Sequence, residues 1–333
     1  MPFLVDDLIS GLDAVDRDRA DLVVVREFGP APAPLGKQAP APAPPGKQAL
    51  VFVKPELLYP GLDRAGNLGA VLRMLGKAGL TIGAAAVLGP ARLADVIAGH
   101  YAMINRVSRL GVDGLTPAAA RALRDRFGGD EPVLGGSQIL ARPGASLDDL
   151  IAAWPVAGSV KLAPGAYAAT INIGGERVVA LNGFHPEQLA HYTTADARVV
   201  AVEVTWETPG WREFRSEIIG ATDPYAADAR SIRAYIRDHR VDLGVPEVDR
   251  GVNGVHASAG PLEAMVELCR FFAVPPSATA FGAAGAFDRL PDDADLHRLF
   301  EATEDCEPAE ALRAINRWPQ PDTTPARGRP ADI

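Results

Sequence analysis

The sequence predicts an α/β protein in which one unit has the element order β-α-β-β-α-β and is interrupted by an insertion. Short apolar runs typical of buried strands occur at residues 50–53, 81–88, 198–204 and 254–257. Segments with apolar residues at helical spacing follow these runs. The chain has 333 residues. At about 150 residues per domain, this length indicates two domains or one domain with a large insertion.

The composition limits the class of protein. Hydrophobic residues make up 47% of the chain and charged residues 23%, which is ordinary for a globular protein. No apolar run reaches the ~18 residues of a membrane-spanning helix, so we expect no membrane contact. Lys and Arg total 33 against 42 Asp and Glu, and the formal charge of -9 disfavours a nucleic-acid partner. An anionic ligand would therefore need a local basic pocket.

Cysteine usage and the N-terminus indicate the compartment. The chain has two cysteines, Cys269 and Cys306, and no CxxC pattern, so a disulfide framework and a cysteine zinc site are both disfavoured. The N-terminus carries acidic residues where a signal peptide carries positive charge. We therefore expect a cytoplasmic protein.

The N-terminal segments are expected to lie outside the main unit. Residues 1–29 are predicted to be an N-terminal appendage, with an amphipathic helix around residues 5–15 and an apolar strand from Asp21 onward. Residues 30–49 are a Pro/Ala-rich linker that reads PAPAPLGKQA and then PAPAPPGKQA. Prolines at alternate positions exclude a helix and a central strand. We expect a spacer, and the alternative is a docking site for a proline-recognising protein partner.

The main unit is expected at residues 50–110 and 198–272. Its pattern begins with strand, helix, strand and a helix opened by Pro90. After the insertion it continues with strand, helix, short strand and helix, and residues 273–333 form a C-terminal helical extension and tail. The main-unit elements are expected at 50–53, 61–78, 81–88, 90–106, 198–204, 210–219, 254–257 and 260–272, and the C-terminal helices near 295–302 and 308–318.

An inserted subdomain is expected at residues 111–197. Helical patterns cover residues 117–127 and 146–154. Strand patterns at 167–173 and 177–182 flank a Gly-Gly-Glu turn and predict a β-hairpin. Long insertions are commonly functional, and a lid and an interface element are equally compatible with this one.

Several common enzyme motifs are absent from the sequence. The Gly-Lys pairs at Lys37, Lys47 and Lys77 lack a following Ser or Thr, so a P-loop kinase is excluded. The sequence has no HExxH and no GxSxG, which removes the main support for a zinc protease and an α/β-hydrolase. His185 and His191 do not share a helical face, so we expect no metal site from them.

One ordered set of residues carries the chemistry. Four spacings define the set: eleven residues from Thr222 to Arg233, three from Asn253 to His256, two from His256 to Ser258, and eleven from His256 to Glu267. Upstream, the set begins with Lys54-Pro55-Glu56 after a strand, followed by His100-Tyr101. In this order and at these spacings, the set resembles the nucleoside diphosphate kinase family. The resemblance covers somewhat under half of the chain.

The resemblance implies a ferredoxin-like antiparallel sheet with helices on its faces, and a ping-pong phosphotransferase. His256 would take the terminal phosphate of ATP or another nucleoside triphosphate as a phosphohistidine and pass it to a nucleoside diphosphate. Glu267 would orient the imidazole, and Ser258 would hold the carboxylate. A ring nitrogen is nucleophilic only while it is unprotonated. The resemblance also implies Mg²⁺, bound through the nucleotide phosphates.

Nucleotide contacts follow from the same resemblance. Lys54 corresponds to a lysine that contacts the transferred phosphate and a sugar hydroxyl, and Tyr101 to the tyrosine beside it. Thr222 and Arg233 correspond to phosphate ligands. Asn253 would bind the ribose.

Other patterns bear on the same pocket. The family has a further phosphate-binding arginine where this chain has Ser216, so a contact from the neighbouring Arg215 requires a one-residue bulge. Glu263 and Glu267 share a helical face, which directs a carboxylate toward the preceding strand. His100 is expected to pack or to cap a helix. A stripe of arginines at helical spacing favours an anion pocket, against a solvated charged face: Arg230, Arg233, Arg237 and Arg240.

Three functions are compatible with these observations. The leading one is nucleoside diphosphate kinase-like transfer through His256. The second is a nucleotide-binding regulatory or assembly module with weak or no kinase activity, favoured by Ala259 at a family acidic position and by Arg109 near the place of a base-stacking phenylalanine. The third is a histidine phosphotransferase with a specialised acceptor. A homo-oligomer is compatible with the resemblance, although the insertion falls where relatives have a subunit-assembly loop.

Overall fold

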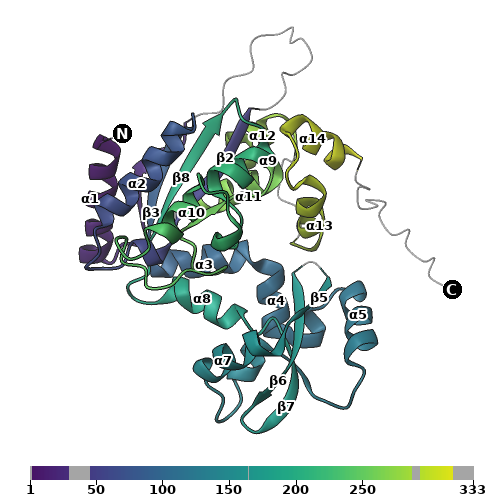
Figure 1. Cartoon of the computed structure of the whole chain (residues 1–333). Helices are drawn as coiled ribbons and strands as arrows, with labels where there is room; N and C mark the ends of the chain where they lie inside the picture. Colours follow the sequence, from purple (N-terminus) through teal and green to yellow (C-terminus); the bar gives the residue numbers. More distant parts are fainter. Residues whose placement is uncertain (1, 30–45, 164, 287–292, 318–333) are drawn as a thin grey trace, which may run out of the picture.

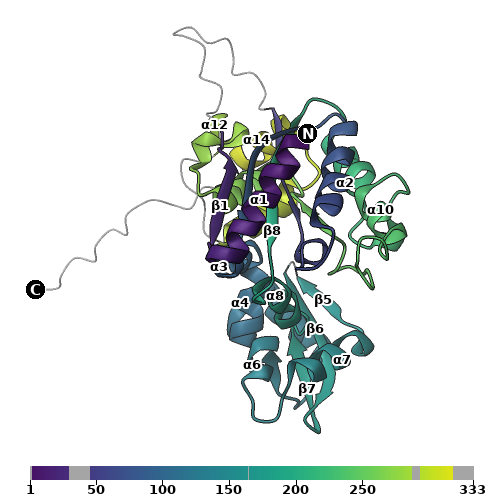
Figure 2. The same ribbon diagram turned by 90° about the vertical axis from the view of Figure 1, so that its left-hand side faces the viewer.

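The computed structural model of the chain describes residues 2–29, 46–163, 165–286 and 293–317. Most of the predicted linker, residues 30–45, lies outside these ranges. The described residues contain a five-stranded sheet in the main unit and a four-stranded sheet in the insertion. Figure 1 shows the insertion joined to one end of the main unit, and the turned view in Figure 2 shows the same arrangement.

The main sheet has the strand order β1-β3-β8-β2-β9, and each neighbouring pair is antiparallel. Helix α2 (Arg64–Lys77) joins β2 to β3, and helix α10 (Ile232–Asp238) lies between β8 and β9. The order β2-α2-β3-β8-α10-β9, with β8 and β9 on either side of β2, is ferredoxin-like and confirms the predicted fold class. The strands are β1 (Leu22–Arg26), β2 (Lys47–Val53), β3 (Thr81–Leu88), β8 (Val199–Trp206) and β9 (Val255–Ala257).

Strand β2 shows why this sheet is central. Ala49, Val51 and Val53 are buried in a core shared with α2, α10 and the N-terminal helix α1 (Pro2–Asp18). Leu50 and Phe52 are buried in a second core shared with α3 (Pro90–His100), α8 (His185–Thr193) and α11 (Pro261–Phe272). Side chains alternate between the faces of a strand, so the stretch of β2 that is apolar at every position, Ala49 to Val53, needs helices on both faces.

The N-terminal residues are part of the main unit, and the expectation of an appendage is wrong. The predicted helix and strand are present as α1 and β1, but β1 pairs with β3 at the sheet edge. Leu8 and Leu12 of α1 share a helical face and are buried in the first core, so the amphipathic pattern marks a core contact. The predicted linker also extends too far, because β2 begins at Lys47 and pairs there with Trp206.

The insertion has its own sheet, with strand order β4-β7-β6-β5, and the predicted hairpin is present as β6 and β7. Alternate residues of β6 lie in two small cores, one on each face of this sheet. Helix α8 then returns the chain to the main unit, where Tyr192 is buried in the second core. The other elements are α4 (Ala102–Leu110), α5 (Pro117–Phe127), β4 (Val133–Gly135), α6 (Gly136–Leu140), α7 (Leu147–Ala157), β5 (Val160–Ala163), β6 (Ala166–Ile173) and β7 (Glu176–Leu181).

The single helix expected at residues 90–106 is broken at Tyr101. Helix α3 ends at His100, Tyr101 has φ −97° and ψ 32°, and α4 begins at Ala102. The Tyr101 side chain packs against the second core, so tertiary packing overrides the local helical pattern. The break lies where the chain passes from the main unit into the insertion.

Short helices follow α11, and they form a third core with its residues. They are α12 (Ala280–Ala283), α13 (Asp293–Thr303) and α14 (Pro308–Asn316). After α13 the chain comes back to the end of β9, because Asp305 N donates to Ala259 O at 3.0 Å. No helix in the described ranges is long and apolar enough to cross a membrane.

Candidate active site

His256 is positioned by the short strand β9. It lies opposite Phe52 of β2 in the strand register, and the two rings stack with their centroids 4.6 Å apart. Gly254, just before the strand, has φ 78°. A Cβ at Gly254 would collide with the Ile236 side chain, so a glycine is required where β9 begins.

The carboxylate of Glu267, on α11, holds one nitrogen of this ring. His256 Nε2 lies 2.7 Å from Glu267 Oε1, and Ser258 Oγ donates to Glu267 Oε2 at 2.5 Å. Ser258 Oγ also accepts a hydrogen bond from Leu50 N of β2 at 3.0 Å. The structure therefore brings the three residues together, with the helix directing its carboxylate toward the preceding strand.

Burial and charge set the protonation of this group. Burial lowers the pKa of His256 to about 4, against the opposing attraction of Glu267. Burial would raise the pKa of Glu267, but the imidazoles of His256 and His100 outweigh it and hold that pKa well below its usual range. At neutral pH the ring is therefore neutral and the carboxylate ionised. An ionised carboxylate only accepts hydrogen bonds, so Nε2 carries the ring hydrogen.

The second ring nitrogen of His256 is available for chemistry. Nδ1 has no hydrogen-bond partner among the described residues. It carries a lone pair, because the ring is neutral and its hydrogen is on Nε2. His256 lines a cavity of about 980 Å³. The same cavity is lined by every residue predicted to contact a nucleotide: Lys54, Tyr101, Arg215, Thr222, Arg233 and Asn253.

Two buried cations lie in the cavity wall. Lys54 Nζ donates to Gly251 O at 2.8 Å, and burial lowers the pKa of Lys54 to about 8. Arg233 donates to Gly220 O at 2.8 Å and to Val255 O at 3.0 Å, while its buried Nε has no partner in the described part of the chain. Burial lowers the pKa of Arg233 to about 10. Both side chains therefore carry charge at neutral pH. The wall of the whole cavity carries five basic residues and five acidic ones, so the positive charge is local to the part around Lys54 and Arg233.

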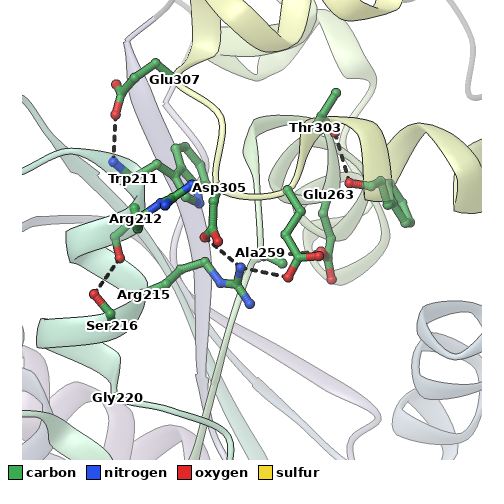
Figure 3. A network of polar contacts seen from close by, with 12 residues as sticks. Trp211, Arg212, Arg215, Ser216, Gly220, Ala259, Glu263, Thr303, Asp305 and Glu307 are labelled. Carbon is green, nitrogen blue, oxygen red and sulfur yellow. Dashed lines mark hydrogen bonds and ion pairs between the residues drawn. The ribbon is translucent and has the colours of Figure 1, made fainter. Parts of the chain in front are cut away.

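Arg215 reaches the cavity through a bulge. The helix expected at residues 210–219 is α9 (Trp211–Glu213) followed by a π-helix, Phe214–Ile219. A π turn contains one residue more than an α turn. This extra residue is the one-residue bulge that a contact from Arg215 was expected to require. Ser216 Oγ instead donates to a carbonyl of its own helix. Arg215 Nη1 donates to Glu304 Oε1 at 2.9 Å and to Asp305 Oδ1 at 2.7 Å (Figure 3).

Asn253 and Tyr101 complete the predicted wall. Asn253 Nδ2 donates to Thr222 O and to Arg250 O, each at 3.0 Å, while its buried Oδ1 has no partner among the described residues. Burial and the carboxylate of Glu267 raise the pKa of Tyr101, so its hydroxyl stays protonated at neutral pH. Both residues line the same cavity as His256, and their nucleotide contacts stay predictions.

Sequence reasoning missed two contacts of this site. His100 Nδ1 lies 3.0 Å from Glu267 Oε1, and its ring meets the His256 ring edge-on at 4.7 Å. The sequence signal that could have identified His100 as a site residue is its position next to Tyr101 in the ordered set. His191 Nε2 lies 2.7 Å from Oε2 of the buried Glu56. These two residues are 135 positions apart, so no local pattern connects them.

The predicted arginine stripe does not form one face of the cavity. Helix α10 spans only Ile232–Asp238, so Arg230 and Arg240 lie outside it. Arg230, Arg237 and Arg240 bind carboxylates or carbonyls near them instead. Of the four arginines, only Arg233 lines the cavity. The helix is too short to hold the whole stripe in one line.

No protein-family model and no curated protein matches the sequence. Among solved structures, the chain is similar to the nucleoside diphosphate kinase of Aquifex aeolicus, with 18% identity, a TM-score of 0.33, and coverage of 68% of this chain and 94% of that one. The Encephalitozoon cuniculi nucleoside diphosphate kinase gives 14% identity, a TM-score of 0.34, and coverage of 70% and 92%.

A nucleoside diphosphate kinase family protein from Babesia bovis gives 16% identity, a TM-score of 0.33, and coverage of 68% of this chain and 88% of that one. Similarity at these values does not assign the chain to that family. The ferredoxin-like fold rests on the strand order of the chain itself.

Proposed function

We propose that the protein is a nucleoside diphosphate kinase-like phosphotransferase that carries phosphate on Nδ1 of His256. The observation that supports it is a neutral imidazole with a free Nδ1 at a cavity whose wall also carries Lys54 and Arg233. Cations beside a nucleophile favour an anionic electrophile, and phosphoryl transfer depends mainly on such positioning and charge stabilisation. The donor is ATP or another nucleoside triphosphate, and the acceptor is a nucleoside diphosphate.

The proposed cycle consists of two displacements. First, the Nδ1 lone pair bonds to the terminal phosphorus while the bond from that phosphorus to the bridging oxygen breaks, and the nucleoside diphosphate leaves with the electron pair. Second, a terminal oxygen of another nucleoside diphosphate attacks the phosphohistidine, and the N–P bond breaks to restore the lone pair. Glu267 keeps the ring hydrogen on Nε2 and stabilises the charge that the phosphorylated ring acquires.

Mg²⁺ is part of this proposal as an ion that enters with the nucleotide. The residues present fit it, because Asp249 lines the cavity and offers a carboxylate, the type of ligand that Mg²⁺ prefers. The ion would neutralise charge on the phosphates during transfer.

Radiolabelling tests the proposal. The full-length protein is incubated with γ-labelled ATP and Mg²⁺, and the label on the protein is measured before and after acid treatment. We expect acid-labile label on the wild type and none on His256→Ala. The matched control is His239→Ala. His239 lies at the C-terminal end of α10, its side chain is 48% exposed, and it is not among the residues that line the cavity. This control should be labelled like the wild type.

The same experiment separates the alternatives. Transfer of the label to GDP, CDP or UDP establishes the nucleoside diphosphate kinase reaction. Tight nucleotide binding without label supports the regulatory or assembly module and contradicts the enzyme. Label that stays on His256 in the presence of every diphosphate supports the third function, a specialised acceptor.

One observation favours that third function as the second candidate. Trp154, Pro155 and Phe184 of the insertion line the same cavity as His256, and the Trp154 and Phe184 ring centroids are 5.8 Å apart. An aromatic wall supplied by an insertion gives the pocket a means to select an acceptor. Homo-oligomer formation and a protein partner for the linker stay predictions.

A further inference from the structure

Four potential metal ligands converge behind the nucleophile. They are His100 at the end of α3, His256 on β9, and Glu263 and Glu267 on α11. One nitrogen or oxygen atom of each lies within 4.8 Å of those of the other three. Glu267 Oε1 is the centre of the group, 2.7 Å from His256 Nε2 and 3.0 Å from His100 Nδ1.

This donor set fits a transition-metal ion. Two imidazoles and two carboxylates match the ligands of Zn²⁺, whereas Mg²⁺ and Ca²⁺ prefer oxygen alone. Tetrahedral bonds of about 2.1 Å separate the ligand atoms by about 3.3 Å, so side-chain shifts of roughly 1 Å convert the cluster into a coordination shell. Strand β9 and helices α3 and α11 all pack in the main unit, which limits the rearrangement to the side chains.

The charges of the cluster also favour a cation. Glu263 and Glu267 place two carboxyl groups side by side, and within the described residues neither forms an ion pair with a Lys or Arg, while the charge of Arg215 acts on Glu263. Burial and the neighbouring Glu267 raise the pKa of Glu263 well above its usual range, so Glu263 holds a proton at neutral pH, and this proton leaves to solvent when an ion binds. The hydrogen bonds to the two groups come from His256 Nε2 and Ser258 Oγ, which donate to Glu267, and from Ala259 N, which donates to Glu263 Oε2 at 3.2 Å. A divalent ion would neutralise both groups at once.

The cluster is accessible from two sides. His256 and Glu263 line the large cavity. His100 and Glu263 line a second cavity of about 300 Å³. An ion can therefore reach the four side chains without local unfolding of α11 or β9.

We propose that His100, His256, Glu263 and Glu267 form a binding site for one divalent transition-metal ion of the Zn²⁺ class. The ion binds the lone pair that Nε2 gains when the ring hydrogen moves from Nε2 to Nδ1. This site goes beyond the proposed phosphate transfer and does not depend on it. A metal-bound ring carries its hydrogen on Nδ1, so the metal-bound and the phosphate-accepting states of His256 exclude each other.

Metal binding to the full-length, chelator-treated protein tests the proposal. Isothermal titration with Zn²⁺ gives the stoichiometry and affinity, and the visible absorption of bound Co²⁺ reports the coordination geometry. We expect one ion per chain and tetrahedral Co²⁺ bands. His100→Gln and Glu263→Gln should each weaken Zn²⁺ binding about tenfold or more, and neither substitution removes the nucleophile.

Matched controls make the same changes outside the cluster. Glu187→Gln alters a carboxylate that lines the cavity, His239→Gln alters an exposed histidine, and Cys306→Ser removes the partly exposed thiol. These variants should bind Zn²⁺ like the wild type. The proposal is overturned if no ion binds, or if the cluster variants bind as tightly as the controls. Labelling of His256 with ATP and Mg²⁺ on the same preparations reports phosphate transfer separately.

Discussion

The two ends of the large cavity are built in different ways. At the nucleophile end, His256, Ser258 and Glu267 come from β9, its C-terminal flank and α11, and buried hydrogen bonds hold them together. At the arginine end, Arg215 lies on a π-helix and is paired with Glu304 and Asp305, which follow α13 (Figure 3). The side chains of the first end are held in place by one another before a ligand binds. At the second end, Glu304 and Asp305 already neutralise the charge of Arg215.

The two ends of the cavity are therefore expected to contribute to different steps, the transfer of phosphate at one end and the binding of nucleotide at the other. The nucleophile end depends on the buried elements of the ferredoxin-like sheet, so its geometry is coupled to the stability of the fold. At the arginine end, two carboxylates occupy guanidinium donors that a phosphate would use. We therefore infer that changes at the first end affect the rate of phosphorylation, whereas changes at the second end affect nucleotide affinity.

The largest expected effect is at the nucleophile end. Glu267→Gln removes the charge that holds the ring hydrogen on Nε2 and that stabilises the phosphorylated ring. We expect the initial rate of His256 labelling to fall by about 100-fold or more. Glu187→Gln, which alters a cavity carboxylate away from the ring, should keep the wild-type rate. A Glu267→Gln rate within a few-fold of the wild type, in a folded variant, would show that the pair is only structural.

The pH dependence of the labelling rate also tests the nucleophile end of the cavity. Labelling needs a neutral ring, and the pKa of His256 in the folded protein is about 4, below the ordinary value of about 6.5. The rate should therefore stay constant from neutral pH down to about 4 and then fall about tenfold per pH unit. The folded state also resists protonation of this ring, so its stability should decrease as the pH falls from about 6.5 toward 4. A rate that already falls near pH 6.5 would contradict the buried, neutral ring.

Lys54 sets the expected alkaline limit. Its pKa of about 8 means that the charge is present below this pH and is lost above it. Nucleotide affinity should therefore weaken above about pH 8, and Lys54→Arg should move that limit to higher pH because a guanidinium keeps its charge. Equilibrium binding of ATP measured between neutral and alkaline pH checks this. An identical limit in the wild type and in Lys54→Arg would assign it to another group.

The nucleophile end was largely predictable from the sequence. Short apolar runs located β2, β3, β8 and β9, because strands buried on both faces are apolar at every position. The i, i+4 relation of Glu263 and Glu267 gave the direction of the carboxylate. His100 was missed because its contact with Glu267 arises from the packing of α3 against α11, two helices far apart in the sequence.

The arginine end was less predictable, for a different physical reason. Helical periodicity assumes a constant number of residues per turn, so it does not reveal the π turn on which Arg215 lies at the cavity. Its partners, Glu304 and Asp305, lie 89 and 90 residues further along the chain. Such pairs arise from the packing of the C-terminal helices against α11, and no local pattern encodes them.

The smallest expected effect is at this arginine end. The double variant Glu304→Gln, Asp305→Asn frees the Arg215 guanidinium and removes two negative charges from the cavity wall. Partly exposed ion pairs contribute about 0.2–1 kcal/mol each, so with two pairs removed ATP should bind about twofold to thirtyfold tighter. Asp305 has φ 57°, and asparagine adopts this conformation readily, so the backbone should be retained. Calorimetric titration with ATP measures the change.

The matched control is Glu301→Gln, which removes one negative charge from an exposed position on α13, shortly before Glu304. It should leave the affinity for ATP unchanged if the effect depends on contact with Arg215 rather than on net charge. Arg215→Ala added to the double variant should abolish the gain, because no guanidinium is then left to bind the phosphate. Tighter binding that survives Arg215→Ala would mean that the two carboxylates act only through long-range repulsion, and the two ends of the cavity would then differ less than their contacts indicate.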